Sequence, residues 1–268
     1  MEPFRVSARL AMPTRSAPRL GREVTVIGWG AFKIGRNEGV KYPTGYDLPT
    51  EEAAARLIHA VIDMGIGVID TAPAYGLSEA RLGAALGSRR AEIFLSSKVG
   101  EVFERGSSTY DFTERACAES LTRSLDELRT QRLDLAWVHS NGDDEAILRE
   151  GGAVRALAHA KADGRVGAIG FSPKSQAGAL AAIEQSDVDA LMLEYHPRDA
   201  SMAPAIAAAG AAGKAVFVKK PLASGHLPPH EAIPWILANP NVTCIVLGGL
   251  NAERLRVNAA LTVSTRPS

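Results

Sequence analysis

The chain has 268 residues, of which 46% are apolar and 22% are charged, a composition typical of globular proteins. Its 30 basic and 30 acidic residues balance, which argues against a nucleic-acid or membrane surface. No apolar run approaches the roughly eighteen residues needed to span a bilayer. Cys117 and Cys244 lie far apart and outside any CxxC spacing, so we expect reduced thiols in a cytoplasmic protein without a metal site.

Strand-like and helix-like segments alternate along most of the chain. The leader over residues 4–20 holds two prolines and predicts a short N-terminal hairpin or an irregular arm. The expected strands cover residues 24–27, 66–70, 93–98, 133–139, 166–172, 188–195, 215–220 and 242–248. The expected helices cover residues 51–64, 78–86, 113–128, 145–162, 174–184, 202–211, 230–238 and 251–261.

This alternation predicts an α/β fold with a parallel sheet whose crossover connections are helices. Eight such units close into a barrel, and the chain length suits that fold. An open doubly wound sheet is the alternative, but it would normally show a domain boundary, and no linker or change of composition is visible. We therefore predict a (β/α)8 TIM barrel that forms a single domain over residues 1–268.

Chemically useful side chains fall at the ends of three consecutive strands. Asp70 ends the second expected strand, Lys98 the third and His139 the fourth. Tyr75 follows Asp70 by five residues, in the loop before the helix that begins at Ser78. Because the carboxyl ends of barrel strands converge on one mouth, we expect these side chains to lie together.

The four groups suit the protonation of an oxygen while a carbonyl is reduced. A tyrosine loses its proton near pH 10, and a nearby ammonium such as that of Lys98 is expected to lower this pKa. Asp70 can hold Lys98, and His139 can bind the substrate oxygen or relay a proton. A Schiff-base lyase that uses Lys98 is an alternative, because eight-stranded barrels host such enzymes.

Five segments resemble motifs of the aldo-keto reductases, and together they extend over nearly the whole chain. These segments are DTAPAYGLSEARLG (70–83), SSKVG (96–100), LAWVHS (135–140), GFS (170–172) and GGLNAERLRVN (248–258). The resemblance implies a catalytic tetrad of Asp70, Tyr75, Lys98 and His139, with Tyr75 as the general acid. It also implies hydride transfer between NADPH, or NADH, and a small aldehyde, ketone or alcohol.

The same resemblance assigns a nicotinamide cofactor site and, less specifically, substrate contacts. The implied cofactor-binding residues are Gly30, Ala31, Ser172, Lys219, Leu222, Ala223, Gly225, Gly248, Gly249, Arg254 and Asn258. Leu222, Ala223 and Gly225 are expected to offer backbone amides to the pyrophosphate. The implied substrate contacts are Trp29, Phe32 and His196.

The chain departs from the family pattern around the carboxamide of the cofactor. Pro173 and Met192 stand where the family has asparagine and glutamine, and Lys219 stands where many members stack a tyrosine. These losses keep open a nicotinamide-binding sensor or regulatory protein with little turnover. Arg254 alone remains of the family's usual 2′-phosphate clamp, which favours NADPH over NADH. The carbonyl substrate, the physiological direction and the oligomeric state stay open.

Overall fold

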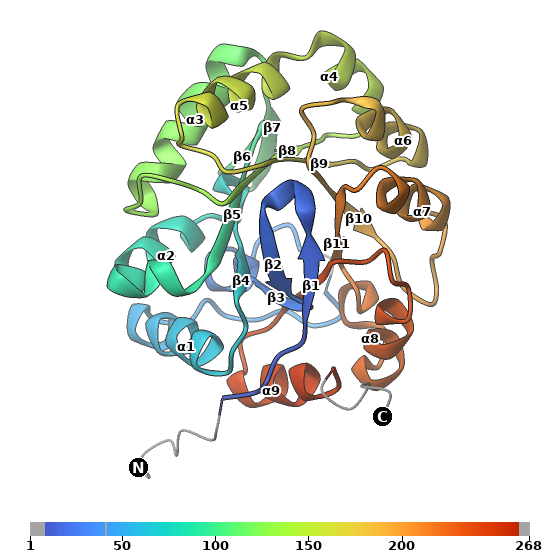
Figure 1. The fold of residues 1–268 in the computed structure, drawn as a ribbon. Helices are drawn as coiled ribbons and strands as arrows, with labels where there is room; N and C mark the ends of the chain where they lie inside the picture. The colour runs from blue at the N-terminus through green and yellow to red at the C-terminus, as the bar shows by residue number, and fades with distance from the viewer. Residues whose placement is uncertain (1–8, 41, 263–268) are drawn as a thin grey trace.

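Eight parallel strands close into a barrel, and helices surround it in the computed structural model, which describes residues 9–40 and 42–262 (Figure 1). The predicted (β/α)8 fold is confirmed. In their order around the barrel the strands are β3 (Ile27–Gly30), β4 (Val68–Asp70), β5 (Phe94–Val99), β8 (Leu135–His139), β9 (Ile169–Ser172), β10 (Ala190–Glu194), β11 (Ala215–Lys219) and β12 (Cys244–Gly248).

Helices connect consecutive barrel strands, as a parallel sheet requires, and the last helix follows β12. They are α1 (Glu51–Asp63), α2 (Ser78–Leu86), α3 (Glu114–Glu127), α4 (Asp144–Glu150), α5 (Gly152–Ala162), α6 (Gln176–Glu184), α7 (Ala203–Ala211), α8 (Pro229–Leu237) and α9 (Ala252–Ala260). The single helix expected over 145–162 is in fact two, α4 and α5. Gly151 separates them in the left-handed conformation, with φ of 69°.

An N-terminal hairpin closes the amino end of the barrel. Its strands β1 (Thr14–Ala17) and β2 (Arg22–Thr25) pair antiparallel and are joined by the 3-10 turn η1 (Pro18–Leu20). Ala17 and Val24 pack against side chains at the starts of the barrel strands, among them Val68. The expected hairpin is confirmed, while residues 4–8 of the leader lie outside the described residues.

The bounds expected for the first barrel strand were wrong. The apolar run over 24–27 is divided between hairpin strand β2 and barrel strand β3. Only Val26 separates the two strands, and for this reason the sequence pattern resembles a single strand. In the structure the chain leaves the hairpin sheet at Thr25 and enters the barrel at Ile27. The barrel strand instead extends to Gly30, which pairs with Asp70 of β4.

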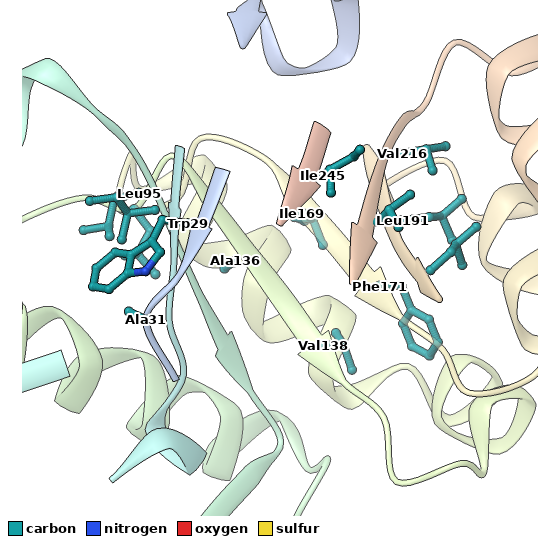
Figure 2. Packing of buried hydrophobic residues seen from close by; sticks show 14 of the residues in the cluster. Trp29, Ala31, Leu95, Ala136, Val138, Ile169, Phe171, Leu191, Val216 and Ile245 are labelled. Atoms are coloured by element: carbon teal, nitrogen blue, oxygen red, sulfur yellow. The ribbon is translucent and has the colours of Figure 1, made fainter. Parts of the chain in front are cut away.

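Two apolar layers hold the barrel together. The outer layer lies between strands and helices and includes Leu95, Val138 and Phe171 (Figure 2). The inner layer fills the barrel, where the rings of Trp137 and Phe217 meet edge to face at 5.2 Å. Trp137 also explains Gly170 on the next strand, because a Cβ there would lie 2.1 Å from the indole Cε3.

Candidate active site

Lys98 is held at the carboxyl end of the barrel by two neighbouring acceptors. Its Nζ lies 2.5 Å from Oδ2 of Asp70 and donates a hydrogen bond of 2.8 Å to the carbonyl of Thr71. Ser96 Oγ donates to the other Asp70 oxygen at 2.7 Å, which fixes the carboxylate. Lys98 and Asp70 are both buried. Burial lowers the pKa of Lys98, while the charge and hydrogen bond of Asp70 act in the opposite sense.

Tyr75 ends the 3-10 turn η3 (Pro73–Tyr75), which follows the end of β4 after two intervening residues. The chain then turns sharply at Gly76, where φ is 57° and a Cβ would lie 2.4 Å from the carbonyl oxygen of Gly35. This turn directs the chain back along α2 and leaves the Tyr75 ring beside Lys98, whose Nζ is 4.9 Å from the ring centroid. Phe32 packs edge-on against the same ring at 4.9 Å.

The pKa of Tyr75 is raised well above its ordinary value, contrary to the lowering expected from Lys98. Burial of the phenol is the largest cause, and the negative charges of Asp70 and Glu101 add to it. The Asp70 charge thus opposes the lowering of the Tyr75 pKa that was expected from the Lys98 ammonium. The phenol is therefore protonated at neutral pH.

His139 completes the cluster from the end of β8. Its ring stands perpendicular to that of Tyr75, with 6.4 Å between the centroids. Nδ1 lies 2.7 Å from Oε2 of Glu101, a close contact in which the ring N–H is poorly aligned on the oxygen. Burial lowers the pKa of His139, and Glu101 opposes this shift.

Glu101 is a member of this cluster that sequence reasoning missed. It begins β6 (Glu101–Glu104), which pairs antiparallel with β7 (Ser107–Tyr110) in a hairpin after β5. The two residues between these strands, Arg105 and Gly106, both have positive φ, as a tight hairpin turn requires. The only sequence signal of this hairpin is Gly106, because an arginine before glycine is not one of the usual turn pairs.

The cluster lines a cavity of about 640 Å³ at the carboxyl ends of the strands. Many of the site residues expected from the sequence line it together. These are Gly30, Phe32, Asp70, Tyr75, Lys98, His139, Ser172, Lys219, Leu222, Gly225 and Gly248. Seven others do not line it, namely Trp29, Ala31, His196, Ala223, Gly249, Arg254 and Asn258.

Trp29 and Ala31 belong to the outer apolar layer, so the expectation that they contact ligands is not met (Figure 2). Trp29 is completely buried, and its Nε1 donates a hydrogen bond of 3.1 Å to the carbonyl of Gly249. The Ala31 carbonyl accepts from Ser78 Oγ at 3.0 Å. Strand alternation explains the result, since Trp29 points toward the helices while its neighbour Gly30 borders the cavity.

His196 is also buried and away from the cavity, so the expected substrate contact is not met there. Its backbone amide and carbonyl exchange hydrogen bonds with Asp199 in a tight turn after β10. Its Nε2 lies 3.6 Å from Oε1 of Glu194. The side chain is thus packed in the turn that follows the strand.

The segment after β11 lies on the rim of the cavity in an unusual backbone conformation. Lys220, Ala223 and Ser224 all have positive φ, which is strained for residues with a side chain. The amides of Ala223 and Gly225 donate to carbonyls of Lys220 and Leu222 within the segment. The expectation that these two amides are available to a pyrophosphate is therefore wrong, because the turn itself uses them.

Lys219 reaches across the cavity from β11 to the end of β9. Its Nζ donates hydrogen bonds of 2.9 Å to Ser172 Oγ and to the carbonyl of Pro173. Burial, followed by repulsion from Lys220, lowers its pKa to about 7. A lysine whose charge changes near neutral pH therefore stands beside the serine expected to bind the cofactor.

The last segment expected to bind cofactor lies at the edge of the cavity. Gly248 borders it, with Oη of Tyr42 3.9 Å from where its Cβ would stand. Gly249 follows, and Asn251 caps α9 by accepting from the amide of Arg254 at 2.9 Å. Arg254 is exposed, and Asn258, one turn further along, is partly buried.

The charges around the cavity fit an anionic dinucleotide. Among the described residues that line the cavity, basic side chains outnumber carboxylates. The six basic residues are Lys33, Arg36, Lys98, Lys174, Lys219 and Lys220, and the three acidic residues are Asp70, Glu101 and Glu194. Such an excess attracts phosphate groups. Small residues at Gly30, Gly225 and Gly248 leave room along the wall.

Comparison with known proteins identifies the family. The family model described as the aldo/keto reductase family matches residues 26–232. The chain belongs to the aldo/keto reductase family. A Pseudomonas aeruginosa protein described as an aldo-keto reductase has a similar crystal structure, with 34% identity, a TM-score of 0.87 and coverage of 97% of this chain and 98% of that one.

Two further comparisons bear on activity and fold. D-threo-aldose 1-dehydrogenase of a Pseudomonas species is 29% identical over 201 residues, which are 66% of this chain but only 59% of that enzyme. A Klebsiella pneumoniae aldo/keto reductase solved with NADP and acetate shares the fold, with a TM-score of 0.71 at 21% identity over 90% of this chain and 86% of that one.

Neither a membrane-spanning helix nor a metal-binding cluster is found among the described residues. None of the helices in this part of the chain has the length and apolar character of a membrane span. No group of three or more histidine, cysteine, aspartate or glutamate side chains within residues 9–40 and 42–262 is arranged to hold a metal ion.

Proposed function

We propose that this aldo-keto reductase interconverts a small carbonyl compound and its alcohol with a nicotinamide cofactor, and that Tyr75 transfers the proton. The arrangement of Lys98 carries the proposal. Its ammonium is fixed between Asp70 and the carbonyl of Thr71, next to the Tyr75 ring and at the wall of the cavity. A fixed cation beside a phenol stabilises the negative charge that develops as the phenol gives up its proton.

In the reduction direction Tyr75 is the general acid. Its raised pKa keeps it protonated at neutral pH, so the proton is present when a carbonyl oxygen approaches. Lys98 then stabilises the phenolate that is left. In the oxidation direction the same pair accepts the proton of an alcohol, and this direction becomes easier as the pH rises.

The residues around the cavity suit a nicotinamide dinucleotide, with NADPH favoured over NADH. Ser172 and Lys219 offer polar groups where the resemblance places the carboxamide, and Lys219 donates to Ser172. Arg254, exposed in α9, suits a 2′-phosphate. When bound, the cofactor supplies or accepts the hydride. NADP in the related Klebsiella pneumoniae structure supports this choice.

The substrate class proposed is a small aldehyde, ketone or sugar. The relative that acts as a D-threo-aldose 1-dehydrogenase supports a sugar or another hydroxylated carbonyl compound. Polar side chains gather at the base of the cavity, while Phe32 and Met202 offer apolar contacts along its wall. This combination suits a short, partly hydroxylated ligand.

A Schiff-base lyase fits the geometry less well. Such an enzyme needs a neutral lysine amine that can approach a carbonyl. Here the Lys98 nitrogen already donates to Asp70 and Thr71, and the residue is only 2% exposed. Its position suits a fixed charge more than a nucleophile.

Cofactor titration followed by an aldehyde panel tests the proposal. We expect NADPH fluorescence to change on binding, and the bound NADPH to be oxidised by small aldehydes. Binding without turnover across a broad panel would favour the sensor. Borohydride-dependent, irreversible labelling of Lys98 by a carbonyl compound, without a nicotinamide cofactor, would favour the lyase.

A further inference from the structure

Glu101 and His139 form a carboxylate–imidazole pair in the cavity wall. Oε2 of Glu101 lies 2.7 Å from Nδ1 of His139, and both residues line the cavity. Glu101 is 9% exposed, so this carboxylate is buried beside the catalytic cluster. A buried carboxylate at this distance from an imidazole controls where the imidazole carries its proton.

The β6–β7 hairpin supplies partners that keep the Glu101 carboxylate ionised. Ser108 Oγ donates to its Oε1 at 2.6 Å, and Tyr110 Oη donates to the same oxygen at 3.2 Å. Burial alone would raise the pKa of Glu101, but the contact with His139 and, after it, the bonds from Ser108 and Tyr110 outweigh burial and bring the pKa to about 2. Glu101 is therefore an anion at neutral pH.

The short contact then fixes the proton of His139. An anionic carboxylate oxygen 2.7 Å from an unprotonated imidazole nitrogen is electrostatically unfavourable, so the contact favours the hydrogen on Nδ1. Burial lowers the pKa of the His139 ring and keeps the ring neutral. Glu101 of β6 raises this pKa, while the charges of Lys98 of β5 and Lys219 of β11 lower it further. Tyr75 of η3 faces it as a neutral phenol.

We propose that Glu101 is a positioning residue that holds His139 as the Nδ1–H tautomer, so that Nε2 is a hydrogen-bond acceptor for a hydroxyl of the substrate. A bare Nε2 cannot bind a carbonyl oxygen, which has no hydrogen to donate. It can bind a hydroxyl next to that carbonyl. The inference rests on the proposed function and narrows its substrates to hydroxylated carbonyl compounds.

Nitrogen NMR of the histidine rings tests the tautomer without any cofactor or turnover. The His139 signals are assigned by their loss in H139N. In the wild-type protein near pH 7 we expect Nδ1 in the protonated range and Nε2 in the unprotonated range. In E101Q we expect a shift toward the Nε2–H tautomer and a lower His139 pKa, because the anion is gone.

The control variant removes a carboxylate from the same strand without touching His139. Glu104 ends β6 and is exposed, so E104Q should leave both nitrogen shifts unchanged. E101D keeps a carboxylate and should retain the Nδ1–H form in part. Thermal unfolding checks that each variant is folded. A wild-type Nε2–H tautomer, or identical His139 spectra in wild type and E101Q, would overturn the proposal.

Kinetics with two aldehydes that differ by one hydroxyl test the consequence for substrates. We expect wild type to prefer glycolaldehyde over acetaldehyde in kcat/KM, and E101Q to lose about 10- to 100-fold on glycolaldehyde. Its loss on acetaldehyde should be smaller. Equal losses on both substrates would contradict the role in substrate choice. Absence of turnover with every carbonyl compound would reject the proposed function, while the NMR result would still decide the tautomer.

Discussion

The Nζ of Lys98 lies 2.5 Å from Oδ2 of Asp70, and this buried pair stands beside the Tyr75 ring. The pair contributes to both the stability and the chemistry of the barrel, because both charged groups are buried and each depends on the other for electrostatic stabilisation. The strand register contributes to this contact: Asp70 of β4 pairs with Ser96 of β5, and Lys98 lies two residues further along β5, on the same face of the strand.

Removing the carboxylate of this pair should therefore reduce both stability and activity. We expect D70N to lose about 3–5 kcal/mol in the free energy of unfolding, because Lys98 is left buried without its counter-charge. Urea denaturation measures the loss. The control is E119Q, which breaks the exposed pair of Arg115 and Glu119. Its effect should be below about 1 kcal/mol, and equal effects of both variants would contradict a buried pair.

Lys219 predicts a particular dependence of stability on pH. Its folded-state pKa of about 7 lies below its ordinary value of 10.5, so the unfolded chain binds the proton more strongly. Lys219 therefore lowers stability below pH 7, and this cost disappears as the pH rises toward 10.5. K219M should be more stabilised, relative to wild type, at pH 6.5 than at pH 9.5. A difference that does not change between those pH values would show that Lys219 is not buried as a cation.

Gly170 tests the packing inside the barrel. A Cβ at this position would lie 2.1 Å from Trp137, so G170A should cost about 1–3 kcal/mol in unfolding free energy. G45A provides the control, since a Cβ at Gly45 meets no heavy atom within 4 Å. Thermal and urea unfolding compare the two variants. Similar stabilities would mean that Trp137 does not fill the space beside Gly170.

Arg254 tests the cofactor preference. R254A should weaken NADPH binding about tenfold or more and leave NADH binding nearly unchanged, because a guanidinium recognises the phosphate that only NADPH carries. Fluorescence titration of both cofactors gives the two dissociation constants. R256A is a comparison at a partly buried arginine two residues later on the same helix. Equal losses for NADPH and NADH in R254A would argue against a phosphate contact.

The barrel was predictable because strand-like and helix-like segments alternate regularly. Asp70, Lys98 and His139 were predictable because each is the last or next-to-last residue of a strand. Trp29 was misplaced because a residue's position near a strand end does not say which way its side chain points. The amides of Ala223 and Gly225 were misjudged because their hydrogen bonds depend on a turn with positive φ at residues other than glycine. Glu101 was missed because a short polar hairpin has little apolar pattern.

The most direct measurement of the central claim is NADPH oxidation by Y75F with the best aldehyde of the panel. Phenylalanine keeps the ring packed against Phe32 and removes only the hydroxyl. We predict a loss of about 10²- to 10⁴-fold in kcat/KM, with the NADPH dissociation constant within about twofold of the wild-type value. Turnover by Y75F at the wild-type rate would show that Tyr75 does not supply the proton.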